Sequence, residues 1–188
     1  FSAPADLVAW VVTCYMLPNV ALMPLYGRLG DELGIRRMLF VGCGIFLAGT
    51  GVNALSRSLP LLLLGRFVQG AGASGVVPLA IAMLTQSFPP ESRGHALGQW
   101  NSIGPVAAVA GALLAGPLID VVGWRAVFLA PLLAGGVAAC AVSKGIRSPT
   151  AREAPNSLRD FDWVGVALLS GTLAFFLMFR MIDGFLSG

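Results

Sequence analysis

Six long stretches of this sequence contain almost no charged residue, and they constrain its fold more than any other feature. They cover residues 7–26, 38–55, 59–88, 96–119, 126–143 and 163–182. A helix of about 20 residues is roughly 30 Å long, which is the thickness of the hydrocarbon core of a bilayer. Each stretch therefore predicts one membrane-spanning helix. Because the apolar residues do not alternate with polar ones, a membrane β-barrel is not expected.

The composition supports an all-α membrane protein, that is, a polytopic bundle of transmembrane helices. Hydrophobic residues make up 56% of the chain and charged residues 11%, whereas soluble domains carry about 25% charged residues. This excludes a disordered chain, a disulfide scaffold and an ordinary soluble enzyme. The three cysteines lie inside apolar stretches and are expected to be small buried hydrophobes. We expect no metal site.

The basic residues are distributed unevenly between the two sides of the predicted bundle. Eight Lys and Arg residues fall in one set of alternate loops and two in the other, and the richer side is predicted to be cytoplasmic. The pI of about 9.1 thus reflects membrane orientation, and no nucleic-acid partner is expected. Both Phe1 and Gly188 would lie outside, which suggests that a preceding span is missing.

Two loops share one pattern, Gly-x-Leu-x-Asp-x-x-Gly-x-Arg. It occurs at residues 27–36 and again at residues 116–125, a constant offset of 89 residues. Three spans separate the two copies, so they would emerge on opposite faces of the membrane. The bundle is therefore predicted to contain inverted three-helix repeats.

The first of these loops, GRLGDELGIRR, is the sharpest local signal. Asp31 stands beside Arg36 and Arg37, and Arg93 lies in the next loop on the same side. A carboxylate among guanidiniums can form a latch that breaks when helices move. The alternative is a basic membrane anchor with a solvated acid.

Arg66 is the one charge deep in a predicted bundle helix, about 10 Å from its outer end. An Arg at the centre of a membrane helix costs about 2.5–3.5 kcal/mol on insertion scales, so a functional role is the default interpretation. Gln69 and Gly70 share its helix face, giving a cation, an amide and a gap. The alternative is an Arg that extends outward to the interface.

These motifs resemble those of the major facilitator superfamily. The signature loop between its second and third helices is matched at Gly27, Leu29, Asp31, Gly34 and Arg36. The sequence departs from it at Gly30, Glu32 and Ile35, so the charge network of the loop differs.

Two further segments carry the resemblance. Residues 66–73 resemble the fourth-helix motif, whose arginine is associated with proton coupling in that family; here it would be Arg66, with Gln69 and Gly70. Residues 111–125 resemble the antiporter motif, matched at Gly111 and Gly116 but with Ala112 and Ala115 in place of Pro and Gly.

Residues 161–165 resemble the start of the seventh helix of fourteen-span drug/proton antiporters. The resemblance implies a transporter bundle over residues 1–143, a cytoplasmic linker over 144–162 and an additional helix over 163–182. The first family helix and the C-terminal half of the parent chain would be missing.

The implied function is proton-coupled efflux of drug-like or amphiphilic small molecules by alternating access, in a multi-pass protein of the bacterial inner (plasma) membrane. The protein would not be an enzyme. Its partners would be lipid, a small-molecule substrate and protons, and it would need no cofactor beyond the proton gradient. Two alternatives remain: a transporter of another substrate class, symporter or uniporter, and a non-transporting half-transporter subunit.

Several polar residues inside the spans allow two interpretations. Asn19, Gln99 and Asn101 are weak candidates for binding substrate, but these amides and Asn53 are better explained by hydrogen bonds between helices. Ser74 lies in a Gly-x-Ser-Gly pattern of intramembrane proteases. The only histidine, His95, is at the cytoplasmic end of another helix, which disfavours that interpretation.

Overall fold

The structure, a computed structural model, describes residues 5–123, 127–145 and 172. Within these residues the chain is helical apart from short connections, and no strand is formed, which confirms the all-α prediction. The helices are α1 (Ala5–Ala21), α2 (Met23–Leu33), α3 (Ile35–Leu55), α4 (Leu59–Ala73), α5 (Val76–Ser87), α6 (Pro90–Val122) and α7 (Leu129–Gly145).

Two of the predicted spans are each divided into two helices. The 7–26 stretch breaks at Leu22, between α1 and α2, and the 59–88 stretch breaks at Ser74–Gly75, between α4 and α5. At the second break proline contributes, because it has no N–H to donate to the carbonyl four residues earlier. Pro78 leaves the Ser74 carbonyl without its helical partner. The helix resumes at once, as the Leu79 N–H donates to the Gly75 carbonyl at 3.1 Å.

The connections are shorter than the sequence indicated. The 27–37 segment was expected to be a loop, but α2 continues to Leu33 and α3 begins at Ile35, so only Gly34 interrupts the helices. Likewise α6 begins at Pro90, inside the expected 89–95 connection. Charged residues mark where a helix leaves the apolar zone, and they do not end it. Most of the expected linker (144–162) and of the 163–182 helix lies outside the described residues.

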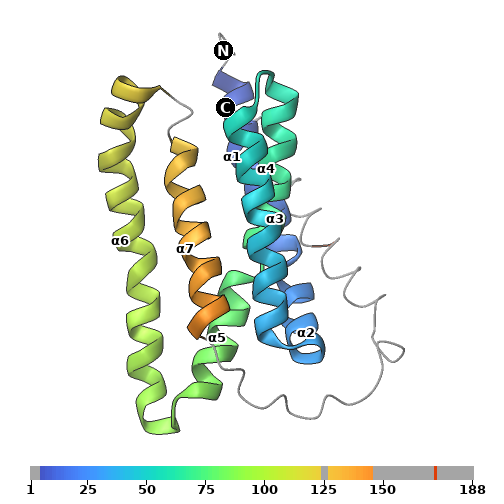
Figure 1. Cartoon of the computed structure of the whole chain (residues 1–188), viewed down its shortest axis with the longest axis vertical. Coiled ribbons are helices and arrows are strands. Elements are labelled where there is room, and N and C mark those ends of the chain that lie inside the picture. The colour runs from blue at the N-terminus through green and yellow to red at the C-terminus, as the bar shows by residue number, and fades with distance from the viewer. Residues whose placement is uncertain (1–4, 124–126, 146–171, 173–188) are drawn as a thin grey trace.

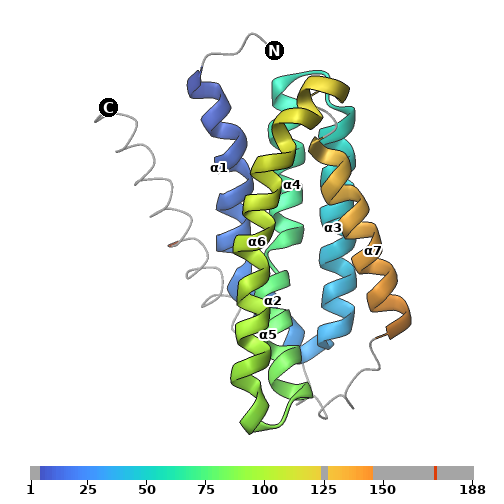
Figure 2. The ribbon, with the colours of Figure 1, turned by 90° about the vertical axis from the view of Figure 1, so that its left-hand side faces the viewer.

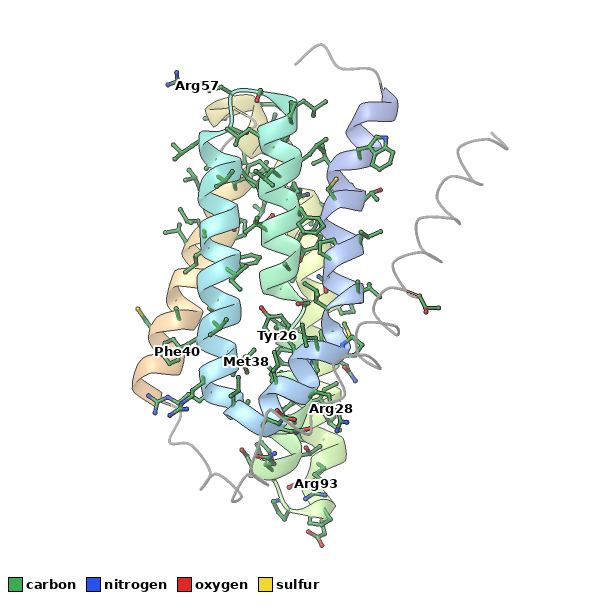
Figure 3. All side chains as sticks on the ribbon, turned by 90° about the vertical axis from the view of Figure 1, so that its right-hand side faces the viewer. Tyr26, Arg28, Met38, Phe40, Arg57 and Arg93 are labelled. Carbon is green, nitrogen blue, oxygen red and sulfur yellow. The ribbon has the colours of Figure 1, made fainter. Side chains whose placement is uncertain are left out.

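The chain crosses the bundle in alternating directions, first through α1 and α2, then α3, then α4 and α5, then α6 (Figure 1). The α2–α3 and α5–α6 junctions lie at one end, and the α3–α4 junction lies at the other. Figure 3 accordingly shows Arg28 and Arg93 at one end and Arg57 at the opposite end. This is the alternation that the uneven distribution of basic residues predicts.

The two copies of the repeated motif end their helices in the same way. Gly34 follows α2 with φ 92° and Gly123 follows α6 with φ 94°. Each N–H donates to the carbonyl four residues back, those of Gly30 and Ile119. The α2–α3 junction and the C-terminal end of α6 lie at opposite ends of the bundle (Figure 1), and the two glycines are 89 residues apart in the sequence. The two copies of the motif thus share a helix-ending glycine, as the predicted inverted repeat requires.

The helices do not pack equally closely. The most extensive pairing is between α3 and α4, with α1 against α4 and α7 against α3. A cluster of Tyr26, Met38 and Leu79 joins α2, α3 and α5 near the end that carries Arg28 (Figure 3). By contrast, α6 lies to one side of the α1–α4 bundle (Figure 1), in front of it in the view of Figure 2, and is exposed along most of its length.

Three helical stretches in the described residues are long and apolar enough to cross a membrane. They are Ile35–Leu55, Leu59–Ser87 and Pro90–Val121, and the apolar helix Trp10–Ala21 is shorter. Large apolar side chains such as Val106, Leu113 and Leu133 are exposed on the outside of the bundle. Such a surface is compatible with lipid rather than water.

Candidate functional site

Glycines bring α4 unusually close to its two neighbours. A Cβ atom on Gly49 of α3 would lie 2.7 Å from the Cα of Gln69 and 2.8 Å from the carbonyl oxygen of Gly65. On the other side of α4, a Cβ on Gly70 would meet the backbone carbonyl of Tyr15 and would lie 2.9 Å from the Cγ of Pro18. Small residues at these positions let the backbones approach, as is typical of membrane helix interfaces.

This close approach brings together four polar side chains of α3 and α4: Thr50, Asn53, Arg66 and Gln69, here called the polar ladder. The Gln69 amide donates to Thr50 Oγ1 at 2.9 Å, and Thr50 donates to the Phe46 carbonyl at 2.7 Å. The oxygen of the Gln69 amide accepts from Arg66 at 3.0 Å and from Asn53 at 3.1 Å. Thr50 and Asn53 are fully buried, and Gln69 is 2% exposed.

Arg66 also contacts α1 and Phe128, the residue directly before α7. Its Nε donates to the Val11 carbonyl at 3.2 Å. The guanidinium carbon lies 5.3 Å from the ring centre of Tyr15 and 5.6 Å from that of Phe128, distances typical of cation–π contacts. Arg66 is half-buried and touches residues from three parts of the bundle. The side chain does not extend outward freely to the interface.

The arrangement holds a positive charge without an acid. The sequences of α3, α4 and α5 contain no Asp or Glu, so the partners of Arg66 are an amide, a carbonyl and two rings. In the part of the chain that the structure describes, its Nη2 forms no hydrogen bond. A guanidinium held in this way can interact with an anionic group, or raise the cost of bringing a second cation beside it.

The predicted pair Arg66 and Gln69 is thus brought into direct contact, and the predicted Gly70 lies against α1. The sequence interpretation did not include Thr50, Tyr15 and Phe128. A hydroxyl and two aromatic rings do not stand out within apolar stretches, so only their contacts distinguish them. Asn53 was expected to form a hydrogen bond between helices, and it does so.

The residues of the predicted cytoplasmic latch lie near the end of the bundle that carries the α2–α3 junction. Asp31 is exposed, and no ion pair of its carboxylate is seen within the described residues. Arg93 is exposed and its Nε donates to the Phe88 carbonyl at 3.0 Å, at the end of α5. Arg37 is exposed, whereas Arg36 is half-buried. The gating role of these residues stays a prediction.

The remaining residues of this motif have structural positions. Leu29 packs against the Tyr26–Met38–Leu79 cluster, and a Cβ on Gly30 would meet the side chain of Leu79. Gly27 lies near Pro78, with its ideal Cβ 3.9 Å from the proline Cβ. Gly34 makes the turn between α2 and α3. These residues fix how α2 sits against α3 and α5.

The candidates on α6 are not brought to the polar ladder. Gln99 and Asn101 are exposed, and so are Gly111 and Gly116, where a Cβ would have no described neighbour within 4 Å. Asn19 on α1 is half-buried. Their roles in substrate binding and helix pivoting stay predictions.

The serine at the α4–α5 break is engaged locally. Ser74 is fully buried, and its hydroxyl donates to the Ala71 carbonyl at 2.6 Å. His95 is exposed near the start of α6, and no hydrogen bond joins it to Ser74 in the described residues. A Ser–His catalytic pair is therefore not assembled.

Comparison with known proteins identifies the family of the chain. The family model of the Major Facilitator Superfamily matches residues 1–188. An uncharacterised MFS-type transporter of Mycobacterium tuberculosis is 33% identical over 94% of this chain, and the match covers 30% of that relative. The drug efflux pump JefA of the same species is 33% identical over 88% of this chain and 32% of its own length.

A third relative, the riboflavin transporter RibZ of Clostridioides difficile, is 28% identical over 95% of this chain and 38% of its own length. The chain thus spans about a third of the length of these relatives. This chain belongs to the Major Facilitator Superfamily and forms part of a multi-pass membrane protein.

Proposed function

We propose that this chain is part of a secondary active transporter that exports drug-like or amphiphilic small molecules in exchange for protons. The observation that carries the proposal is Arg66, a guanidinium whose partners among the described residues are all neutral. The relative JefA is named as a drug efflux pump, which supports the direction of transport and the class of substrate.

In this proposal α1, α3 and α4 form one side of the transport path. Protonation of a carboxylate changes the electrostatic environment of Arg66 and biases an equilibrium between two arrangements of the bundle. The acid is not on α3, α4 or α5, which have none. The charged residues around the α2–α3 turn, including Asp31, would gate the cytoplasmic side. No cofactor other than the proton gradient takes part.

The test is proton-driven efflux in everted membrane vesicles from cells that express the complete gene. Arg66→Ala removes a charged hydrogen-bond donor, a loss of about 1.5–3 kcal/mol, so coupled efflux should fall about tenfold or more. Arg57→Ala, at the exposed end of the bundle, is the matched control and should leave efflux unchanged. Equal efflux by the wild type and Arg66→Ala would remove Arg66 from the mechanism.

A second candidate is transport of another substrate class. The relative RibZ, which is named as a riboflavin transporter, favours this candidate. A panel of amphiphilic cations and of neutral heterocycles in the same vesicles separates the two. Saturable uptake of the heterocycles alone would favour the second candidate.

A further inference from the structure

Two buried polar side chains of α3 have no place in the mechanism proposed above. Thr50 and Asn53 are three residues apart on one helix face, both fully buried. Both bind the same residue of α4, Gln69. Polar groups buried among apolar helices are costly unless they are paired, so their presence calls for an explanation.

The hydrogen bonds of Thr50 fix the direction of the Gln69 amide. The single hydroxyl proton of Thr50 is donated to the Phe46 carbonyl at 2.7 Å, so the oxygen can only accept. It accepts from the NH₂ group of Gln69 at 2.9 Å. The carbonyl end of the amide must then face the opposite way, toward Arg66.

That direction is the one that Arg66 requires. Arg66 has donors only, and its Nη1 donates to the oxygen of the Gln69 amide at 3.0 Å. Were the amide reversed, its NH₂ group would face the guanidinium, and both would be donors. Thr50 thereby excludes the reversed orientation of the Gln69 amide.

Asn53 acts on the same oxygen from the other side. Its NH₂ group donates to the Gln69 amide oxygen at 3.1 Å, while its own side-chain oxygen is buried without a hydrogen-bond partner in the described part of the bundle. The Asn53 amide is therefore oriented so that its NH₂ group reaches the Gln69 oxygen, and this orientation leaves the Asn53 oxygen unpaired in the described part of the bundle. An amide that served only to join helices would be expected to satisfy both ends.

We propose that Thr50 and Asn53 are positioning residues that act through Gln69 to hold the Arg66 guanidinium in its place between α1, α4 and Phe128. The proposal rests on the proposed function of Arg66. It makes the placement of a charge on α4 depend on hydrogen bonds from α3. A shift of α3 relative to α4 then releases the guanidinium without any direct contact between α3 and Arg66.

The test measures the freedom of Arg66 directly, in the protein expressed from its complete gene. Phenylglyoxal modifies unengaged guanidiniums, and peptide mass spectrometry gives the rate at Arg66 separately from the other arginines. Thr50→Val keeps the shape but removes the hydroxyl, and should raise the rate at Arg66 roughly two- to tenfold, the factor of one net hydrogen bond. Thr50→Ser restores the hydroxyl and should restore the wild-type rate.

Thr85 provides the matched control. Its hydroxyl also donates to helix carbonyls, those of Ile81 and Ala82, at 3.0 Å each, but it accepts from no described side chain. Thr85→Val should leave labelling at Arg66 unchanged. Asn53→Leu, which keeps the Thr50–Gln69 pair, is the second test variant should Thr50→Val fail to reach the membrane. Unchanged labelling in both Thr50→Val and Asn53→Leu would overturn the proposal.

Vesicle efflux links the positioning role to transport. Thr50→Val should lower coupled efflux in the wild-type background and have no further effect in an Arg66→Lys background, because it acts through the guanidinium. An equal loss in both backgrounds would mean a structural role only and would overturn the proposal. Faster labelling of Arg66 with efflux insensitive even to Arg66→Ala would instead contradict the proposed function and leave the positioning role standing.

Discussion

The charge of Arg66 is stabilised by dipoles and aromatic rings. Its partners are the Gln69 amide, the Val11 carbonyl and the rings of Tyr15 and Phe128. A counter-ion would neutralise the guanidinium, whereas these partners hold it in place and leave its charge intact. The site can therefore respond to an acid or a substrate that approaches it.

The aromatic contact predicts a difference between two substitutions of Tyr15. A cation–π contact is worth about 0.5–2 kcal/mol. Tyr15→Leu should therefore lower the free energy of unfolding in detergent by about that amount, whereas Tyr15→Phe keeps the ring face and should change it little. Thermal unfolding of the purified protein measures both. The exposed Phe67 on α4 serves as control, since Phe67→Leu should be nearly neutral. Equal losses for Tyr15→Phe and Tyr15→Leu would rule out the ring as the source.

The two cap glycines should tolerate no side chain. At φ 92° and 94°, a residue with a Cβ is strained by about 1–3 kcal/mol. Gly34→Ala and Gly123→Ala should each lower the unfolding temperature, although a Cβ would meet no described atom within 4 Å at either position. Gly44→Ala is the control, because Gly44 is exposed inside α3 and equally uncrowded; it should be neutral or slightly stabilising. The same melting temperature for all three variants would contradict backbone strain.

At the scale of helices, the fold depends on how closely α3 and α4 approach. Gly49 and Gly51 lie two residues apart on α3, but only Gly49 faces α4; a Cβ on Gly51 would have no neighbour within 4 Å. Gly49→Ala should destabilise the bundle by about 1–3 kcal/mol through overpacking. It should also separate the polar ladder. Gly51→Ala should do neither. Chemical denaturation and Arg66 labelling measure the two effects, and similar behaviour of the two variants would be inconsistent with the observed packing.

The sequence predicts that helices exist better than it predicts where they bend. Stretches without charge located α3 and α7 within a few residues, because removing charges from lipid dominates the energetics. Hydropathy does not predict the break before Pro78, because an average over many residues does not register one absent N–H. The absence of charges does not predict the helical continuation of α2 to Leu33 either, because charged residues do not by themselves end a helix.

For the whole molecule, sidedness is the property most open to measurement. Arg57 and Arg93 lie at opposite ends of the bundle (Figure 3). In a variant without the native cysteines, Arg57→Cys and Arg93→Cys should be labelled by a membrane-impermeant maleimide from opposite sides, the latter from the cytoplasm. Right-side-out and everted vesicles give the two exposures. Labelling of both positions from one side would invalidate the alternating arrangement.

The site was partly predictable at this scale too. Arg66 and Gln69 stood out because a charge at depth is costly and an amide shares its face. Thr50 and Asn53 could be located only once the rotation of α3 about its axis was known, since hydropathy does not specify which neighbour a side chain meets. The exposed α6 shows the same limit. Its polar and small residues are plain in the sequence, but which surface they contact is decided by tertiary packing.

The two glycine turns show that different residues set where helices end and how the bundle is oriented in the membrane. Each turn ends a helix through the positive φ of a glycine, and this backbone geometry is the same on either side of a bilayer. The arginines that follow the two turns differ in number, two at positions 36 and 37 but one at position 125. Glycines thus end the helices, whereas arginines set the orientation. Such a unit could be inverted in the membrane by substitutions that relocate its arginines while both glycines are kept.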